Sequence, residues 1–312
     1  MSESPLHTDL PKAVDLINQG ELVGMPTETV YGLAGDAHNP DAVANIYALK
    51  NRPAFNPLIA HVCSLDMATA QAEFSQMAMR LAEAFWPGPM TLVLPVAPSN
   101  TVCDLARAGL DTQALRWPRH DIAQSLISSV GGPIVAPSAN KSGRISPTSR
   151  AHVRSEFGSD LKLVLEGESS VLGLESTVLA VLGEKVTLLR PGSLSRDDIE
   201  KVTGPVTMSL HDDTAPKSPG MLSRHYAPSA KLRLNQRTAS NDEAYLGFGT
   251  HAQPTTLNLS EAGDLTEAAA NLYAMLRELD ETYDAIAVAP IPEQGLGEAI
   301  NDRLRRASLS EA

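Results

Sequence analysis

Lys50 and Arg52 are two cations separated by one residue, at the predicted end of a helix. Pro53 and Pro57 follow them in the chain. Because proline restricts the residue before it, the backbone at Arg52 and Asn56 is held near extended geometry. Long cations on a stiffened loop suit a multiply charged anion, above all a polyphosphate. The alternative is a solvated helix end, where cations offset the macrodipole.

Polar side chains also stand where four apolar strands are predicted to end at a proline. Because proline cannot donate to a strand ladder, each polar group is released at a strand end, and ligands of open α/β sheets gather there. These ends together predict one polar cavity with few carboxylates. The alternative is that the prolines only terminate edge strands. The polar residues are Thr27 and Thr29 beside Pro26, Arg116 before Pro118, Ser138 and Asn140 after Pro137, and Arg190 before Pro191.

Residues 138–148 form a loop rich in hydroxyls and containing Gly143. Such a loop can hold phosphate through its backbone N–H groups. Its spacing does not match the Walker A pattern, so a P-loop nucleotide site is not predicted.

The composition narrows the class of protein. A chain of 312 residues has room for a large core and for two domains. Its 25 basic and 37 acidic residues give a formal charge of −12, which argues against nucleic acid as the primary ligand. Cys63 and Cys103 are the two cysteines, so neither a disulfide framework nor a cysteine zinc site is expected. Without an apolar span or a secretory signal pattern, we expect a cytoplasmic protein that does not enter membranes.

The elements that must position these residues follow from periodicity and capping. We expect helices over 10–18, 40–50 and 66–86, strands near 58–62, 90–94 and 162–166, and a hairpin over 178–190. A catalytic domain is predicted over 1–208 and a linker rich in proline and glycine over 209–229. Residues 230–312 alternate strands with helices, which predicts a smaller parallel α/β domain.

Several motifs in order resemble the YrdC/Sua5 family, the L-threonylcarbamoyladenylate synthases. The resemblance covers residues 10–207, and the 218–228 segment is similar to that of the longer, Sua5-type members. The motifs are Pro26-Thr-Glu-Thr-Val-Tyr-Gly-Leu33, Lys50-x-Arg52 with Asn56-Pro-Leu58, Pro87-Gly-Pro-Met-Thr91, Ala136-Pro-Ser-Ala-Asn140 with Ser142-Gly143, Glu175-Ser-Thr177, Ser218-Pro-Gly-Met221 and Arg224-His-Tyr-Ala-Pro228.

The resemblance implies a twisted α/β fold around a large open cavity, with a smaller C-terminal Rossmann-like domain. It implies that ATP, L-threonine and bicarbonate react to threonylcarbamoyl-adenylate and pyrophosphate, with Mg²⁺ held mainly by the ATP phosphates. A separate transferase complex would then modify adenosine 37 of tRNAs that read ANN codons, and weak contact with tRNA itself is part of the expectation.

The same resemblance assigns residues to roles. Arg116 is the expected clamp for the threonine carboxylate, and Lys50 and Arg52 are the expected catalytic cations. Read alone, His61 would be a structural histidine, and Thr112, Ser138 and Ser146 would be turn residues. The implied threonine site comprises Thr29, His61, Arg116, Ala136 and Ser176, and the implied ATP site comprises Lys50, Arg52, Asn56, Thr112, Ser138, Ser146, Arg190 and Tyr226.

Three alternatives stay open at this point. The fold has been linked to binding of double-stranded RNA, which would make the protein a translation-associated module without adenylation activity. A carbamoyl transferase of the hydrogenase-maturation type contains a related domain, but it carries zinc-finger cysteines that this chain lacks. Residues 218–228 are either a plain tether or, as we expect, a cover for the cavity with Tyr226 against the nucleotide.

Overall fold

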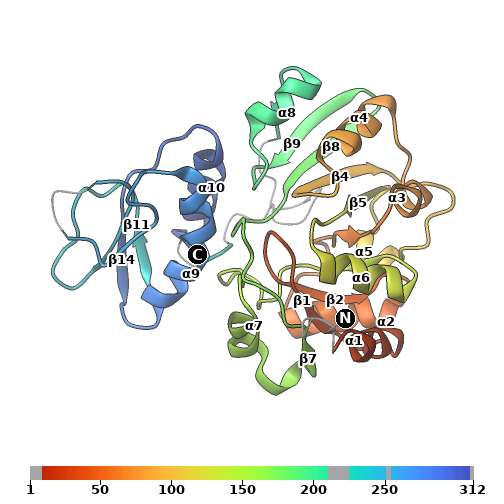
Figure 1. Cartoon of the computed structure of the whole chain (residues 1–312), viewed down its shortest axis with the longest axis horizontal. Helices are drawn as coiled ribbons and strands as arrows, with labels where there is room; N and C mark the ends of the chain where they lie inside the picture. The colour runs from red at the N-terminus through yellow and green to blue at the C-terminus, as the bar shows by residue number, and fades with distance from the viewer. Residues whose placement is uncertain (1–8, 210–224, 251–253, 310–312) are drawn as a thin grey trace, which may run out of the picture.

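The computed structural model describes residues 9–209, 225–250 and 254–309 of the chain. Two sheets organise it (Figure 1): a ten-stranded mixed sheet in the order β10-β9-β8-β4-β5-β3-β6-β2-β1-β7, and a four-stranded sheet in the order β11-β14-β12-β13. Within these residues, no helix has both the length and the apolar character to traverse a lipid bilayer. Most of the predicted linker, residues 210–224, lies outside the described residues.

The first domain holds the large sheet, with helices packed around it. Its strands are β1 (Val23–Met25), β2 (Gly32–Asp36), β3 (Ala60–His61), β4 (Met90–Pro95), β5 (Thr112–Arg116), β6 (Ile134–Val135), β7 (Leu163–Val164), β8 (Thr177–Leu182), β9 (Lys185–Arg190) and β10 (Thr207–Met208). Its helices are α1 (Leu10–Asn18), α2 (Pro40–Lys50), α3 (Leu65–Gln71), α4 (Gln76–Phe85), α5 (Asp104–Arg107), α6 (Asp121–Val130), α7 (Arg150–Phe157) and α8 (Arg196–Thr203), with a 3-10 turn at Gly158–Asp160.

Helix α2 delivers the two cations, as predicted. The Asn39 side chain accepts hydrogen bonds from the backbone N–H groups of Asp41 and Ala42, and Pro40 occupies the first helical position. Asn51 caps the other end in a left-handed conformation, with φ of 50°. The chain turns sharply there, so Lys50 and Arg52 leave the helix in different directions.

The single helix predicted over 66–86 is wrong. Two helices stand there, α3 and α4, separated at residues 72–75. Ala72 is extended and bridges Val96, which follows β4, so the chain pairs with the residue beyond the end of this strand instead of continuing the helix. The Ser75 side chain then accepts from the Ala78 N–H and starts α4 afresh.

The predicted hairpin over 178–190 is confirmed. Strands β8 and β9 pair antiparallel, and Gly183 turns the chain between them with φ of 62°. Strand β8 also pairs with β4, which pairs with β5, so Ser176 and Arg190 lie at the same edge of the sheet as the end of β5, with β4 between.

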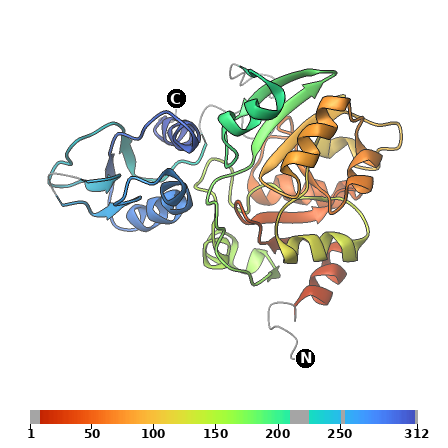
Figure 2. The ribbon, with the colours of Figure 1, turned by 45° about the horizontal axis from the view of Figure 1, so that its top comes forward.

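The second domain is the parallel α/β unit that the sequence predicts. Its strands pair in parallel throughout. Strand β13 was not predicted, and its two residues are both of intermediate exposure. Figures 1 and 2 both show its two helices between its sheet and the first domain. The elements are β11 (Lys231–Arg233), β12 (Ala244–Gly247), β13 (Leu257–Asn258), α9 (Leu265–Asp280), β14 (Ala285–Val288) and α10 (Leu296–Ala307).

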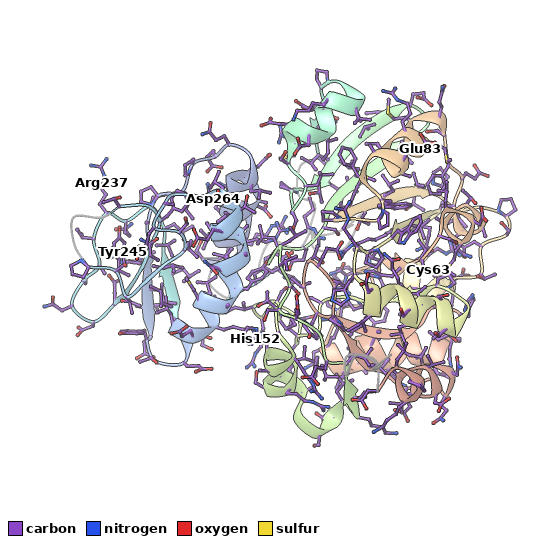
Figure 3. All side chains as sticks on the ribbon, viewed as in Figure 1. Cys63, Glu83, His152, Arg237, Tyr245 and Asp264 are labelled. Carbon is purple, nitrogen blue, oxygen red and sulfur yellow. The ribbon has the colours of Figure 1, made fainter. Side chains whose placement is uncertain are left out.

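The cores of the two domains are continuous where they meet. Val30, Ile145 and Leu174 of the first domain belong to the same buried cluster as the apolar faces of α9 and α10. Gly173 lies against the backbone of α9 so closely that an added Cβ would stand 2.5 Å from the Ala269 carbonyl oxygen. Figure 3 shows His152 of α7 on the side of the first domain that faces the second. The second domain is therefore docked on the first, over the segments that surround the candidate site.

Candidate functional site

One cavity gathers the polar strand ends of the first domain. The empty space between its lining residues is ≈ 520 Å³, a volume that includes open solvent. Arg116 ends β5, His61 ends β3 and Arg190 ends β9, while Thr29 stands in the loop between β1 and β2. The full lining is Thr29, Val30, Arg52, Ile59, His61, Arg116, Ala136, Pro137, Ser138, Glu175, Ser176, Arg190, His225 and Tyr226. The predicted polar cavity at strand ends is thus present, and Glu175 is its one carboxylate among the described residues.

Arg116 is held by two neighbours at one end of this cavity. Its Nη1 donates to the Thr29 hydroxyl at 2.8 Å, and its Nη2 lies 2.7 Å from Oε2 of Glu28. Glu28 is buried, and its other oxygen accepts from the Arg119 backbone N–H at 3.1 Å. The Nε of Arg116 has no hydrogen-bond partner among the described residues. The guanidinium is thereby fixed in place with donor capacity left for a carboxylate ligand.

His61 is neutral in this setting. Burial, and then the nearby charge of Arg116, lower the pKa of its imidazole to about 3. A neutral imidazole offers one donor and one acceptor, and the Nδ1 of His61 has no partner within the described part of the chain. The ring can therefore bind a polar ligand group but cannot supply positive charge.

Two further guanidinium groups stand at the other end. Arg52 donates to the Asn56 and Pro57 carbonyl oxygens at 3.0 and 2.8 Å. Burial lowers the pKa of Arg52 to about 10, so it stays charged at neutral pH. Arg190 donates to the Ser176 carbonyl oxygen at 2.8 Å, and Ser176 in turn shares a hydrogen bond of 2.7 Å with the Thr91 hydroxyl. Three guanidinium groups around one carboxylate make a cavity suited to an anion with several charges.

Lys50 does not line the cavity. Its buried Nζ donates to the carbonyl oxygens of Ser138 and Asn140, and burial holds its pKa well below the usual range. It therefore fastens the 138–140 loop behind Ser138, while Arg52 alone of the two cations reaches the cavity. A catalytic role for Lys50 stays a prediction. Because Lys50 bonds the 138–140 loop and does not line the cavity, its effect on a ligand would be indirect.

The other predicted nucleotide residues lie at different depths. Asn56 is buried beside Arg52, and both polar atoms of its side chain lack partners among the described residues. Ser146 is buried and donates to Oε1 of Glu175 at 2.6 Å. Thr112 begins β5, roughly 13 Å along the strand from Arg116, and is not brought to this cavity.

Tyr226, near the C-terminal end of the predicted linker, is part of the cavity lining. Its backbone has a positive φ of 64°, which a bulky residue adopts only when its surroundings hold it there. The ring lies edge-on to His225, with centroids 4.1 Å apart, and its hydroxyl has no partner among the described residues. An unpaired buried hydroxyl at a strained position points to a ligand.

Glu28 and Glu175 are the site residues that the sequence reasoning missed. Both stand inside motifs that it quoted, beside Thr29 and Ser176, which it did assign. The available signal was a carboxylate directly before a hydroxyl residue and close to apolar residues, which predicts a buried partner of opposite charge. No group of three or more potential ligands among His, Cys, Asp and Glu is close enough to hold a metal ion within the described residues.

Comparison with known proteins assigns both domains. The profile of the Sua5, YciO and YrdC family, described as "Telomere recombination", matches residues 15–192. The profile described as "Threonylcarbamoyl-AMP synthase, C-terminal domain" matches residues 194–308.

The chain belongs to the Sua5/YrdC family.

Individual members of the Sua5/YrdC family agree over nearly the whole length. Threonylcarbamoyl-AMP synthase of Pyrococcus abyssi is 40% identical, with 95% of this chain and 93% of the relative covered. The enzyme of the same name from Bacillus subtilis is 36% identical, with 96% and 92% covered. The crystal structure of P. abyssi Sua5 complexed with L-threonine superimposes with a TM-score of 0.89 and 39% identity, covering 96% of this chain and 94% of that one. The predicted Sua5-type architecture of two α/β domains is confirmed.

Proposed function

We propose that this protein is a nucleotidyltransferase that makes L-threonylcarbamoyladenylate and pyrophosphate from ATP, L-threonine and bicarbonate. The observation that carries the proposal is the composition of one cavity. Arg116 and Thr29 at one end suit an amino acid, and Arg52 and Arg190 at the other suit a polyphosphate. The names of the P. abyssi and B. subtilis relatives, and the L-threonine in the matching Sua5 crystal structure, support it.

The amino acid end has groups for each part of threonine. Arg116 receives the carboxylate, and this charge-assisted bond contributes about 1.5–3 kcal/mol. Neutral His61 and the Ser176 hydroxyl hydrogen-bond the polar substituents. Ile59 and Ala136 line the same region and give the threonine methyl group an apolar contact. Such a contact favours threonine over serine by about 1–3 kcal/mol.

The nucleotide end neutralises phosphate charge. Arg52 and Arg190 face the phosphates, Ser138 begins the loop that Lys50 fastens, and the Tyr226 ring packs against the nucleoside. Ser146 has already committed its proton to Glu175, so it offers the nucleotide only acceptor lone pairs. It therefore suits a ribose hydroxyl or the adenine amino group and not a phosphate.

The chemistry needs no enzymic nucleophile. The threonine amine takes up CO2 derived from bicarbonate and loses a proton, giving a carbamate. A carbamate oxygen then attacks the α-phosphorus of ATP, the bond from that phosphorus to the bridging oxygen breaks, and pyrophosphate leaves with the electron pair. The protein orients the carbamate in line and offsets the charge of both phosphate groups, with Arg52 and Arg190 as the charged groups.

Mg²⁺ fits this scheme as a companion of ATP. Glu175, the carboxylate in the cavity lining, already accepts hydrogen bonds from Ser146 and Tyr273 on one oxygen and from Tyr273 and Arg303 on the other. Phosphate oxygens and water are therefore the ligands we propose for the ion. When bound, it supplies charge neutralisation to the leaving pyrophosphate.

The product carries a mixed anhydride of a carbamate and a phosphate, so a second reaction must consume it. We propose that a separate transferase complex passes the threonylcarbamoyl group to adenosine 37 of tRNAs that read ANN codons, in keeping with the family. A role as an RNA-binding module alone is the competing candidate. The formal charge of −12 disfavours it, because unaided nucleic-acid binding draws on a basic surface.

Pyrophosphate release from ATP tests the proposal. We expect release with threonine and bicarbonate together, and little release when either is left out. Serine should support the reaction about 5- to 100-fold less efficiently, because one methyl group separates the two amino acids. Release that ignores the omission of threonine or bicarbonate contradicts the assignment. Binding of tRNA with a steep salt dependence, without any turnover, would favour the RNA-binding module.

A further inference from the structure

A carboxylate in the wall of the cavity is held from the second domain. Glu175 lies in the first domain, and Arg303 of α10 donates from Nε to its Oε2 at 2.9 Å. The Tyr273 hydroxyl of α9 lies 3.1 and 2.9 Å from the two carboxylate oxygens. The Ser146 hydroxyl completes the set at 2.6 Å. Of the three side chains that bond the Glu175 carboxylate within residues 9–209, 225–250 and 254–309, two therefore come from the second domain.

These groups are sealed from water. Arg303 is 1% exposed, Tyr273 0%, Ser146 0% and Glu175 6%. Burial alone would raise the pKa of Glu175, but the charges of Arg303 and Arg190 and the hydrogen bonds from Ser146 and Arg303 lower it to about 2. The carboxylate is thus charged and fully occupied, and it does not act as a base.

The same two side chains also support the Tyr226 ring. The guanidinium carbon of Arg303 lies 4.9 Å from the ring centroid, within the range of a cation–π contact. Tyr273 stacks on Tyr226 with centroids 5.8 Å apart and planes 25° apart. Arg303 further donates from Nη2 to the Pro191 carbonyl oxygen at 2.9 Å, directly after Arg190. One arginine therefore contacts the segment after β9, the Glu175 carboxylate and the Tyr226 ring.

All three of these contacts lie at the nucleotide end. Glu175 takes the only proton of Ser146, Pro191 follows Arg190, and Tyr226 lines the cavity. At the threonine end, Arg116 is held by Thr29 and Glu28, both of the first domain. The second domain thus bonds polar groups at the nucleotide end directly, whereas at the threonine end its contact is apolar packing against Val30.

We propose that Arg303 and Tyr273 are positioning residues for the nucleotide, through which the second domain sets the geometry of Glu175, Ser146 and Tyr226. They act through these neighbours and do not touch the reacting atoms. This inference rests on the proposed function for the identity of the nucleotide, ATP. It assigns to the second domain a share in nucleotide affinity and not in threonine affinity.

The test separates the two substrates. Tyr273→Phe removes one hydroxyl and keeps the ring that stacks on Tyr226, and Arg303→Lys keeps the charge but loses the planar fork. Arg305→Lys is the matched control, because Arg305 stands on the same helix and pairs with exposed Glu293 at 2.9 Å. KM for ATP and for threonine, kcat, and the melting temperature are measured for each full-length variant.

We expect both positioning variants to raise KM for ATP about 10-fold or more, since small misplacements of a binding group carry large penalties. KM for threonine should stay within about twofold of that of the unmodified protein, because Arg303 and Tyr273 do not bond the residues assigned to threonine. Arg305→Lys should change neither. Equal losses for both substrates, in proportion to a lowered melting temperature, would show a merely structural role and overturn the proposal. Unchanged KM for ATP in Tyr273→Phe and Arg303→Lys would overturn it as well.

A binding measurement keeps this inference apart from the proposed function. Calorimetric titration with a nonhydrolysable ATP analogue gives Kd without turnover. If the unmodified protein binds the analogue but releases no pyrophosphate with threonine and bicarbonate, the proposed function fails, while a weaker Kd in Tyr273→Phe still supports the positioning role. If Arg303→Lys does not fold, the same titration on Tyr273→Phe decides: an unchanged Kd refutes the proposal.

Discussion

Arg116 and Glu28 form a buried ion pair, with 2.7 Å between Nη2 and Oε2, and their side chains are 5% and 6% exposed. The pair stands at the end of the cavity that suits the threonine carboxylate. An incoming carboxylate therefore meets a guanidinium that is already oriented and partly neutralised. Glu28 keeps Arg116 in place before the ligand arrives, so removal of either partner should have distinct effects.

Arg116→Ala should lower kcat/KM for threonine about 10- to 100-fold, the equivalent of one charge-assisted hydrogen bond. KM for ATP should change far less, because Arg52 and Arg190 serve the other end of the cavity. Steady-state kinetics with each substrate varied in turn measure both. Unchanged kcat/KM for threonine would show that the carboxylate binds elsewhere.

The Glu28→Gln/Arg116→Ala double variant separates stability from binding. Arg116→Ala alone leaves a buried, uncompensated carboxylate, which costs about 3–5 kcal/mol of folding free energy. Replacing that carboxylate with an amide should restore most of this stability and none of the threonine use. Urea denaturation gives the free energies of unfolding. A double variant as unstable as Arg116→Ala would mean that the ion pair is not the source of the loss.

Arg52→Ala should impair ATP use, with KM for ATP raised about 10-fold or more by the loss of a phosphate contact. Arg52→Lys should recover only part of it, since an ammonium group cannot bond the Asn56 and Pro57 carbonyl oxygens and also face a phosphate as a planar fork does. The comparison uses pyrophosphate release at saturating threonine. Full activity in Arg52→Ala would remove this residue from the nucleotide site.

Tyr226→Phe should change stability and ATP binding in opposite directions. The Tyr226 hydroxyl is buried with no partner among the described residues, so its removal should stabilise the ligand-free protein by about 1 kcal/mol. If that hydroxyl bonds the nucleotide, the same change weakens ATP binding. Thermal unfolding with and without ATP measures both effects. A variant that binds ATP as tightly as the unmodified protein would limit Tyr226 to ring packing.

The stability of the fold should decline as the pH falls from 6.5 toward 3. Burial lowers the pKa of His61 and of His225 to about 3. Below pH 6.5, therefore, these histidines bind protons in the unfolded chain but stay neutral in the folded protein, and protonation favours the unfolded chain. Each histidine should remove about 1.4 kcal/mol per pH unit in this window. His61→Asn should flatten the curve by one such increment. Parallel curves for His61→Asn and the unmodified protein, from urea denaturation at pH 7.5, 6.0 and 5.0, would contradict this.

The polar strand ends could be predicted from the sequence because proline and strand periodicity are local signals. Thr29, Arg116, Ser138 and Arg190 do meet in one cavity, although they come from different parts of the chain. The direction of the Lys50 side chain could not be predicted from the sequence. Lys50 ends α2 and bonds the 138–140 loop, and the left-handed turn at Asn51 then redirects the chain so that Arg52 faces the cavity.

Contacts between the domains cannot be predicted from local sequence patterns. Nothing near Glu175 in the chain indicates Arg303, because the two residues are 128 positions apart and meet only after α10 packs on the first domain. The break between α3 and α4 has a similar origin. Ala72 pairs with Val96 just after β4, and helix periodicity over 66–86 gives no sign of that pairing.

The separation of Glu175 from Arg303 also sets the order in which the protein can be assembled during translation. Domains fold as units, and the amino-terminal one folds first as the ribosome adds 5–20 residues per second, so 128 residues take roughly 6–25 s. Late in that interval, once β8, β9 and β10 have also been made, the nascent first domain should have Thr29, Arg116 and Ser176 in place, while Glu175 still lacks Arg303. The nucleotide end should therefore be completed last, after the end of the cavity that suits the amino acid.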